Sequence, residues 1–373
     1  MIYDFLIIGA GISGSAAAYE LCSLGTVAII EAETGPDYHS TGRSAALYTR
    51  NFGGPVVRQI NSASYAFFQN PPPGFCDIPL LTPRGLLTVA GPKDVEKLAL
   101  IHQQSTPDAP IDMLTTSQAC EKAPVLRPEF IEAATYEAGV CDIEVSSLHQ
   151  AYLRAVKAKK CIPTYSMRIE AIERKNGTWH VSANGQTMTG KTLVNAAGAW
   201  ADQVAIMAKA APTGLVAKRR TAIIVDAPQG VDPKLLPAID FADSESYLKP
   251  EAGKLMASPG DETPIEPQDV QPEEWDIAVI ADWLQQRTII EVHRIEHSWA
   301  GLRTFASDDA PIVGFDPLIE DFFWLAGQGG YGIMMAPALA RVTSSLITSG
   351  TIPADLLSLG VNKHSISPSR FCR

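Results

Sequence analysis

The chain has 373 residues, of which 46% are hydrophobic and 19% are charged, and its formal net charge is −11. These values predict a soluble globular protein with two domains, each having its own core. They argue against a nucleic-acid partner, whose phosphates would repel the protein, and against a transmembrane protein, because no apolar stretch approaches about 18 residues.

The cysteines and the N-terminus carry no sign of export or of metal binding. The six cysteines lie far apart and show neither a Cys-x-x-Cys pair nor a cysteine–histidine spacing of the zinc type. The apolar N-terminus lacks a basic segment and is interrupted by glycines, so we expect no targeting peptide. We therefore expect a cytoplasmic protein with no metal and with free thiols at Cys22, Cys76, Cys120, Cys141, Cys161 and Cys372.

A strand, a glycine-rich turn, a helix and a second strand are predicted at the start of the chain. The apolar run in residues 3–8 is typical of a buried parallel strand, and residues 27–30 are a second such run. Residues 13–24 predict a helix that ends at Gly25. The turn after the first strand reads Gly-Ala-Gly-Ile-Ser-Gly, which is the GxGxxG pattern.

Each part of this unit has a physical role in holding a dinucleotide. Gly9 permits the tight turn, Gly11 lets the backbone approach a pyrophosphate, and Gly14 lets the helix pack closely on the strand. The helix N-terminus near Ser13 offers free N–H groups and a positive dipole end. Glu31, twenty residues after Gly11, can accept hydrogen bonds from ribose hydroxyls. The complete unit favours dinucleotide binding over a chance glycine turn.

The central part of the chain alternates between helices and strands. Residues 36–53 form a loop with little apolar content. We expect helices at 57–68, 93–104 and 147–157, and strands at 86–90, 167–174, 178–182 and 191–195. The pair 167–174 and 178–182 predicts a hairpin around Asn176-Gly177.

Residues 216–299 have a different pattern. Short alternating strands are predicted at 220–225, 246–249, 254–258 and 289–295, with one helix at 275–286, which indicates a mostly antiparallel sheet. The parallel type returns with a strand at 322–326, a glycine loop at 327–332 and an apolar helix at 333–346. We predict an α/β fold whose Rossmann-like domain comprises 1–80, 140–215 and 300–373, with an inserted α+β domain of 81–139 and 216–299.

Three loops are candidates for close approach to a ligand. The glycine loop at 327–332 has four glycines in six residues and again leads into a helix N-terminus, which is more than an ordinary connection needs. The loop at 39–46 has small residues, hydroxyls and free amides, although a solvated loop would look the same. The predicted strand that ends at residue 195 leads into Ala197 and Gly198, where small residues would also let the backbone come close to a ligand.

Together these motifs resemble the D-amino-acid-oxidase-like FAD-dependent oxidoreductases, which include glycine and sarcosine oxidases. The likeness is strongest to bacterial D-arginine dehydrogenase and extends over essentially the whole chain. It is carried by the GxGxxG with Glu31 and by YHSTGRSAA (38–46), NPPPGFC (70–76), LVNAAGAWAD (193–202), KRR (218–220), SYLKP (246–250), DVQPE (269–273), EHSWAGLR (296–303) and GQGGYGI (327–333).

The resemblance implies a noncovalent FAD. Some relatives tether the flavin through a cysteine just before Leu302, and Gly301 stands there in this chain. The positive end of the C-terminal helix would stabilise the negative charge of the reduced flavin. The implied FAD-binding residues are Ser13, Glu31, Ala32, Ser40, Thr41, Gly42, Arg43, Ser44, Ala45, Ala46, Leu47, Ile169, Gly329, Gly330, Tyr331, Gly332, Ile333 and Met334.

The resemblance also implies a clamp for a substrate carboxylate, formed by Arg220, Arg303 and Tyr247. A guanidinium matches a carboxylate bidentately, and Arg303 lies in an apolar stretch where an idle arginine is unexpected. A structural salt bridge is the alternative for each arginine, and we expect Lys218 and Arg219 to be surface charges. The substrate amine would lie near Tyr331, the Gly330 carbonyl and Thr49.

The chain departs from the arginine-specific relatives in the side-chain pocket. Leu86 replaces a glutamate, Leu47 a histidine and Phe52 a tyrosine. A leucine cannot neutralise a buried cation, so we expect a preference for neutral or apolar side chains, with Arg50 binding an acidic group as the second possibility.

The implied reaction is the oxidative deamination of a small D-amino acid to a 2-oxo acid through an imino acid. We find no convincing side-chain base for the amine proton and assign that proton to solvent. The electron acceptor would be oxygen or a quinone. Two alternatives stay open: the oxidation of a 2-hydroxy acid or of a secondary amine such as sarcosine or proline, and a non-catalytic nucleotide-binding or NAD-using protein.

Overall fold

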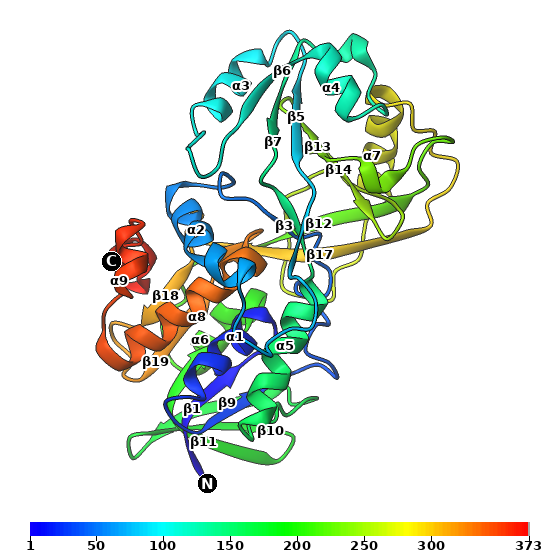
Figure 1. Cartoon of the computed structure of the whole chain (residues 1–373). Helices are drawn as coiled ribbons and strands as arrows, with labels where there is room; N and C mark the ends of the chain where they lie inside the picture. Colours follow the sequence, from blue (N-terminus) through cyan, green and yellow to red (C-terminus); the bar gives the residue numbers. More distant parts are fainter. Residues whose placement is uncertain (372–373) are drawn as a thin grey trace.

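The structure, a computed structural model that describes residues 1–371, has two lobes, each built on its own large sheet (Figure 1). The sheet of the first lobe has the order β18-β19-β11-β1-β2, and β10 and β9 continue from β11 as a hairpin. Its strands are β1 (Ile2–Ile8), β2 (Val27–Ile30), β9 (Ile169–Lys175), β10 (Thr178–Ala183), β11 (Gln186–Asn195), β18 (Ile312–Phe315) and β19 (Phe322–Ala326).

Helices cover the central parallel strands of this sheet, which explains why those strands are apolar on both faces. The last four residues of β1 and all of β2 and β19 are buried. One face packs against α1 (Ile12–Leu21) and α8 (Gly332–Ser349), and the other packs against α6 (Ala201–Met207). Further helices of this lobe are α2 (Pro55–Gln69), α5 (Val145–Ala158), α9 (Ala354–Ser358) and α10 (Lys363–Ile366).

The second lobe has a sheet in the order β20-β17-β12-β15-β14-β13-β5-β7-β6, with β16 paired to β12. All of its pairs are antiparallel except β13 with β5. Its strands are β5 (Leu86–Ala90), β6 (Asp112–Thr115), β7 (Ala133–Glu137), β12 (Val216–Val225), β13 (Ala238–Phe241), β14 (Tyr247–Glu251), β15 (Lys254–Ser258), β16 (Thr263–Pro264), β17 (His297–Phe305) and β20 (Gln328–Gly329).

Strand alternation gives this second sheet one apolar face and one polar face. The apolar face carries Leu87, Ile223, Ile239 and Leu248, and it packs against α4 (Thr116–Lys122) and α7 (Glu274–Arg287). The opposite face carries the alternate residues, among them Arg220 and Tyr247. The long strands β12 and β17 run along the junction of the lobes (Figure 1).

Smaller elements complete the described chain. A three-stranded sheet of β3 (Leu47–Tyr48), β8 (Cys141–Ile143) and β4 (Leu81–Pro83) lies apart from the two large sheets, and α3 (Val95–His102) packs on β7. No helix within residues 1–371 has the length and apolar character needed to cross a membrane. In the same residues, no three His, Cys, Asp or Glu side chains are grouped as a metal site.

The predicted α/β fold is confirmed, with one wrong element. Residues 289–295 form no strand, because β17 begins only at His297. The segment begins with two adjacent isoleucines, of which Ile290 is buried against α7 and Ile289 is exposed. The predicted helix at 13–24 is shorter, since α1 ends at Leu21 and a turn leads to Gly25.

Two further expectations can be compared with the described residues. Strand β17 pairs with β12 in the second sheet, although the expected boundary placed residues after 299 in the first domain. Five cysteines are free, namely Cys22, Cys76, Cys120, Cys141 and Cys161, while Cys372 lies outside the described residues.

Candidate cofactor and substrate site

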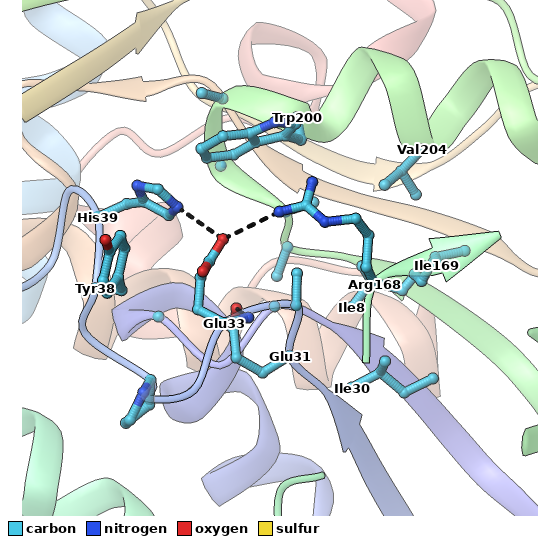
Figure 2. A pocket seen from close by; sticks show the side chains of 18 of the residues that line it. Ile8, Ile30, Glu31, Glu33, Tyr38, His39, Arg168, Ile169, Trp200 and Val204 are labelled. Atoms are coloured by element: carbon cyan, nitrogen blue, oxygen red, sulfur yellow. Dashed lines mark hydrogen bonds and ion pairs between the residues drawn. The ribbon is translucent and has the colours of Figure 1, made fainter. Parts of the chain in front are cut away.

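A cavity of about 300 Å³ opens at the carboxyl ends of β1 and β2. This is where ligands bind in open α/β sheets. Figure 2 shows Glu31 beside Ile8 and Ile30 on one side, Trp200 on the opposite side, and Ile169 and Val204 as an apolar wall. The predicted residues Gly9, Gly11, Ala32, Ser40, Thr41, Ala197 and Gly198 also line this cavity.

The glycines of the first turn occupy positions where a side chain would be strained or crowded. Gly9 has φ +100°, which L side chains rarely adopt. A Cβ at Gly14 would collide with the Gly9 carbonyl, so helix and strand could not pack as they do. Gly11 leaves room beside Thr41, whose Oγ1 accepts a hydrogen bond of 3.0 Å from the Ile12 N–H at the start of α1.

Glu31 is held by two backbone donors. Its carboxylate accepts hydrogen bonds from the Ala10 N–H at 2.7 Å and the Glu33 N–H at 3.0 Å. Each carboxylate oxygen has a further lone pair, so the side chain can still accept from ribose hydroxyls.

Four polar or aromatic residues around this cavity had no role assigned from the sequence, although His39 and Trp200 lie within the motifs at 38–46 and 193–202. Glu33 pairs with His39 at 3.2 Å and with Arg168 at 3.4 Å (Figure 2). The His39 ring lies 4.6 Å from the Trp200 ring, centre to centre. No motif marks Glu33 or Arg168, and only the tertiary structure shows that the four residues converge on one cavity.

A second cavity, of about 150 Å³, lies between the lobes. The N-terminal ends of α1 and α8 both reach it, and Arg220, Tyr247 and Arg303 line it from the second sheet. Gly11, Ser40, Thr41, Ala196 and Gly198 line both cavities, so the two are neighbours. Ser13, Arg43, Ser44, Ala45, Gly329, Gly330, Gly332 and Ile333 are further predicted residues on its wall.

The loop at 37–46 joins the two lobes beside this cavity. Ser40 Oγ donates to the Leu302 carbonyl at 2.7 Å, and the Arg43 guanidinium donates to the carbonyls of Val270 and Ala300 at 3.0 Å. A Cβ at Gly301 would lie 3.3 Å from that of Arg43. A tethering cysteine would be crowded here, and no cysteine within residues 1–371 lines either cavity.

Arg220 and Arg303 form a pair of like charges on the cavity wall. Arg220 Nη2 contacts Glu262 Oε1 at 3.0 Å, but its buried Nε has no hydrogen-bond partner within the described chain. Burial lowers the pKa of Arg220, and the charge of Arg303 lowers it further. An anion placed between them would relieve both effects, and a carboxylate has the geometry to bind a guanidinium bidentately.

Several predicted substrate residues are not on the wall of this cavity. The Arg50 guanidinium stacks 3.6 Å from the centre of the Tyr65 ring and donates to the Asp108 carbonyl at 3.1 Å, so it is engaged elsewhere. Phe52 is 48% exposed, and its ring contacts the Tyr331 ring edge-on at 5.5 Å. Leu86 lies opposite Glu137 on the neighbouring strand.

The remaining predicted residues lie close by. Gly42 and Ala46 line a third, more polar cavity of about 650 Å³ on the other side of the loop. The Sδ of Met334 in α8 accepts a hydrogen bond of 3.4 Å from the Thr49 N–H. Leu47 is the first residue of β3, which ends just before Thr49. Burial raises the pKa of Tyr331.

The expectation that Arg219 is a surface charge is wrong. Arg219 is 3% exposed and forms ion pairs with Asp276 at 2.8 Å, with Asp261 at 3.4 Å and with Glu273. The reason is strand alternation: Arg219 points to the opposite face of β12 from Lys218 and Arg220. Lys218 is partly buried and pairs with Glu262 at 2.7 Å.

Two carboxylates also share the polar face of the second sheet with Tyr247. Glu137 accepts hydrogen bonds from Asn51 Nδ2 at 2.8 Å and Thr49 Oγ1 at 3.4 Å, and burial raises its pKa. Burial raises the pKa of Asp240 to about 7, and the charges of Glu137 and Glu245 contribute to the rise. No motif marks these residues, because the sheet alone brings them together.

Sequence comparison decides the family. The family model for the FAD-dependent oxidoreductases called DAO matches residues 4–346. The chain belongs to this family. It is therefore an FAD-dependent oxidoreductase. The glycine cradle, Glu31 and the N-terminus of α1 fit the phosphates and ribose of that cofactor, and the N-terminus of α8 fits its flavin.

Individual relatives are distant in sequence and close in fold. A bovine FAD-dependent oxidoreductase domain-containing protein 1 is 23% identical over 407 aligned residues, which cover 93% of this chain and 81% of that protein. L-proline dehydrogenase from P. horikoshii has a TM-score of 0.86 at 20% identity, covering 99% and 98% of the two chains. Glycine oxidase from Geobacillus kaustophilus has a TM-score of 0.79 at 21% identity, covering 97% and 99%.

Proposed function

We propose that this DAO-family protein oxidises the carbon–nitrogen bond of a small amino acid and yields a 2-oxo acid and ammonia by way of an imino acid. The observation that carries the proposal is the pair Arg220 and Arg303, which lines the same cavity as the N-termini of α1 and α8. A guanidinium pair of this kind binds the carboxylate of a substrate. The two solved structures named above belong to proteins that, by their names, act on proline and glycine.

The residues around the cavities have separate tasks. Gly9, Gly11 and the N-terminus of α1 bind the pyrophosphate of FAD, and Glu31 binds its adenosine ribose. FAD, when bound, accepts a hydride from the substrate carbon. The positive end of α8 stabilises the negative charge that reduction leaves on the cofactor.

Arg220, Arg303 and Tyr247 hold the substrate carboxylate and so orient the Cα–H bond. Catalysis in such a site comes mainly from positioning and from a preorganised electrostatic field. Leu86 presents apolar surface on the same sheet face, and the neighbouring Glu137 is already bonded to Asn51 and Thr49. These contacts favour a substrate with a neutral side chain. The D configuration, the noncovalent FAD and oxygen or a quinone as the electron acceptor are proposed on the family resemblance alone.

Flavin bleaching tests the proposal directly. The purified protein with bound FAD is mixed without oxygen with D- and L-amino acids, sarcosine, proline and 2-hydroxy acids, and the flavin absorbance is followed. We expect neutral D-amino acids to bleach it fastest. Fastest bleaching by a secondary amine or a 2-hydroxy acid would reassign the substrate, and no bleaching by any compound would refute the proposal.

A further inference from the structure

Asp240 lies on the sheet face that carries the proposed carboxylate clamp. It is the cross-strand partner of Tyr247 between β13 and β14, and the partner of Thr88 between β13 and β5. Paired residues point to the same face of a sheet, so the Asp240 carboxylate and the Tyr247 side chain leave the sheet together. The alternation along β12 puts Arg220 on this face as well.

One oxygen of the Asp240 carboxylate is left unbonded in the described part of the chain. Its Oδ1 is buried and has no hydrogen-bond partner within residues 1–371. A buried polar atom without a partner is costly, and a catalytic role or a bound ligand is one of the explanations for such an atom. The missing partner is a donor, because a carboxylate oxygen accepts.

Neighbouring side chains shift the pKa of Asp240 in both directions. Thr88 donates to it from β5, while Glu137 on β7 and Glu245 in the turn before β14 raise its pKa by their negative charge. Glu137 itself is held by Thr49 and Asn51. The cation on the same face of β14, Lys249, is engaged by Asp142 at 3.1 Å and Glu251 at 2.9 Å.

The proposed reaction needs a proton acceptor at this place. An amino acid arrives with an ammonium group, and its nitrogen must lose a proton before its lone pair can assist the loss of the Cα hydrogen. With the substrate carboxylate held by Arg220, Arg303 and Tyr247, the ammonium would be placed toward Asp240, which is the cross-strand partner of Tyr247. A base is most efficient when its pKa is near the working pH.

We propose that Asp240 accepts the proton of the substrate ammonium. An N–H bond breaks and an O–H bond forms on the Asp240 carboxylate. The Cα hydrogen would then leave as a hydride with the two electrons of the Cα–H bond, for which bound oxidised FAD would be the acceptor, and the nitrogen lone pair would form the C=N bond of the imino acid. This inference rests on the proposed function, and it replaces solvent as the acceptor of that proton.

The test measures the rate of anaerobic flavin reduction against pH, from about pH 5 to about pH 10, with the best amino acid of the substrate panel. The wild-type rate should rise through one group that titrates near pH 7. In Asp240→Asn the rate at neutral pH should fall about 100-fold and should recover only where the substrate ammonium itself loses its proton. Asp112→Asn, an exposed carboxylate at the edge of the same sheet, is the matched control.

Two further variants move the same titration in opposite directions. Glu137→Gln removes a charge that raises the pKa of Asp240, so the rise in rate should shift to lower pH. Thr88→Val removes a hydrogen bond that lowers this pKa, so the rise should shift to higher pH. These variants keep the proposal testable if Asp240→Asn does not fold with FAD.

The outcomes separate this inference from the proposed function. If amino acids reduce the flavin but the profiles of Asp240→Asn, Glu137→Gln and Thr88→Val match the wild type, Asp240 is not the acceptor and the proposed function stands. If no amino acid reduces the flavin of the wild-type protein, the proposed function fails and the Asp240 assignment fails with it.

Discussion

Arg303 lies directly beneath Gly330: a Cβ added at Gly330 would be 3.0 Å from Arg303 Nη1 and 3.3 Å from its Cδ. The glycine loop and the arginine come from different parts of the chain, since Gly330 precedes α8 and Arg303 is on β17. Glycine at this position leaves space over the guanidinium, and a side chain there would force Arg303 to shift.

Gly330→Ala should weaken substrate binding without unfolding the protein. The methyl group would push against the Arg303 guanidinium and displace it from the carboxylate, so the half-saturating substrate concentration in flavin reduction should rise about tenfold. Gly139→Ala is the control, because a Cβ there meets no atom within 4 Å. Equal affinities for the two variants would mean that the substrate does not contact Arg303.

Arg303→Lys should lose most of the activity although it keeps the charge. A lysine cannot form two parallel hydrogen bonds to a carboxylate, and we expect kcat/KM to fall about 100-fold, or about 2.7 kcal/mol. The control Arg294→Lys changes an arginine that is 76% exposed and should have no effect. Retained activity in Arg303→Lys would indicate that the arginine has a structural role only.

Leu86→Glu tests the side-chain pocket. We expect the new carboxylate to increase the turnover of cationic relative to neutral D-amino acids about tenfold, since it supplies the charge that the leucine lacks. The variant should also be less stable, because Glu137 lies directly opposite and like charges repel across strands. Leu86→Gln has a similar shape without the charge, so an equal change in both variants would rule out an electrostatic cause.

Arg219→Met should destabilise the protein strongly while leaving the polar face of the sheet intact. Removing this guanidinium leaves Asp261 and Asp276 buried without their cation, and breaking a buried pair in this way costs about 3–5 kcal/mol. Urea unfolding gives the free energy, with Arg294→Met as the exposed control. A loss below about 1 kcal/mol would show that the network behaves like an exposed ion pair.

Asp4→Asn should reveal a pH-dependent contribution to stability. Hydrogen bonds from Lys191 and Thr26 lower the pKa of Asp4 to about 2. A lowered carboxyl pKa stabilises the fold above the unfolded-state value near 4, and this contribution is lost as the pH falls toward 2. Because the side chain is 34% exposed, we expect a difference of at most about 1 kcal/mol at pH 7.

The measurement for Asp4→Asn is the free energy of urea unfolding at pH 7, 5 and 3. The gap between wild type and variant should be the same at pH 7 and 5 and smaller at pH 3. A gap that does not change with pH would assign the effect to packing rather than to charge.

Local chemistry explains why the cofactor unit could be predicted. Gly9, Gly14 and Glu31 act within one strand–helix–strand unit, whose contacts join residues near one another in the sequence. The strands at 86–90, 254–258 and 322–326 have the predicted bounds, because a short apolar run between turn residues has few other conformations. At 289–295 an apolar run did not predict a strand correctly, because Ile290 can be buried without its backbone pairing to a neighbouring strand.

The amino-acid sequence by itself was enough to predict the dinucleotide-binding unit and the division into a parallel and a mostly antiparallel sheet. Its resemblance to a known family added the pair Arg220 and Arg303. The tertiary structure alone decided which polar residues share a cavity. It buried Arg219 on the face opposite to Arg220, turned Arg50 toward Tyr65, and placed Asp240 beside Tyr247. The physical reason is that these contacts join segments that are distant in sequence. For Arg219 and Asp240 they depend on strand register, because a shift of one residue in β12 or β13 would move either side chain to the other face of the sheet.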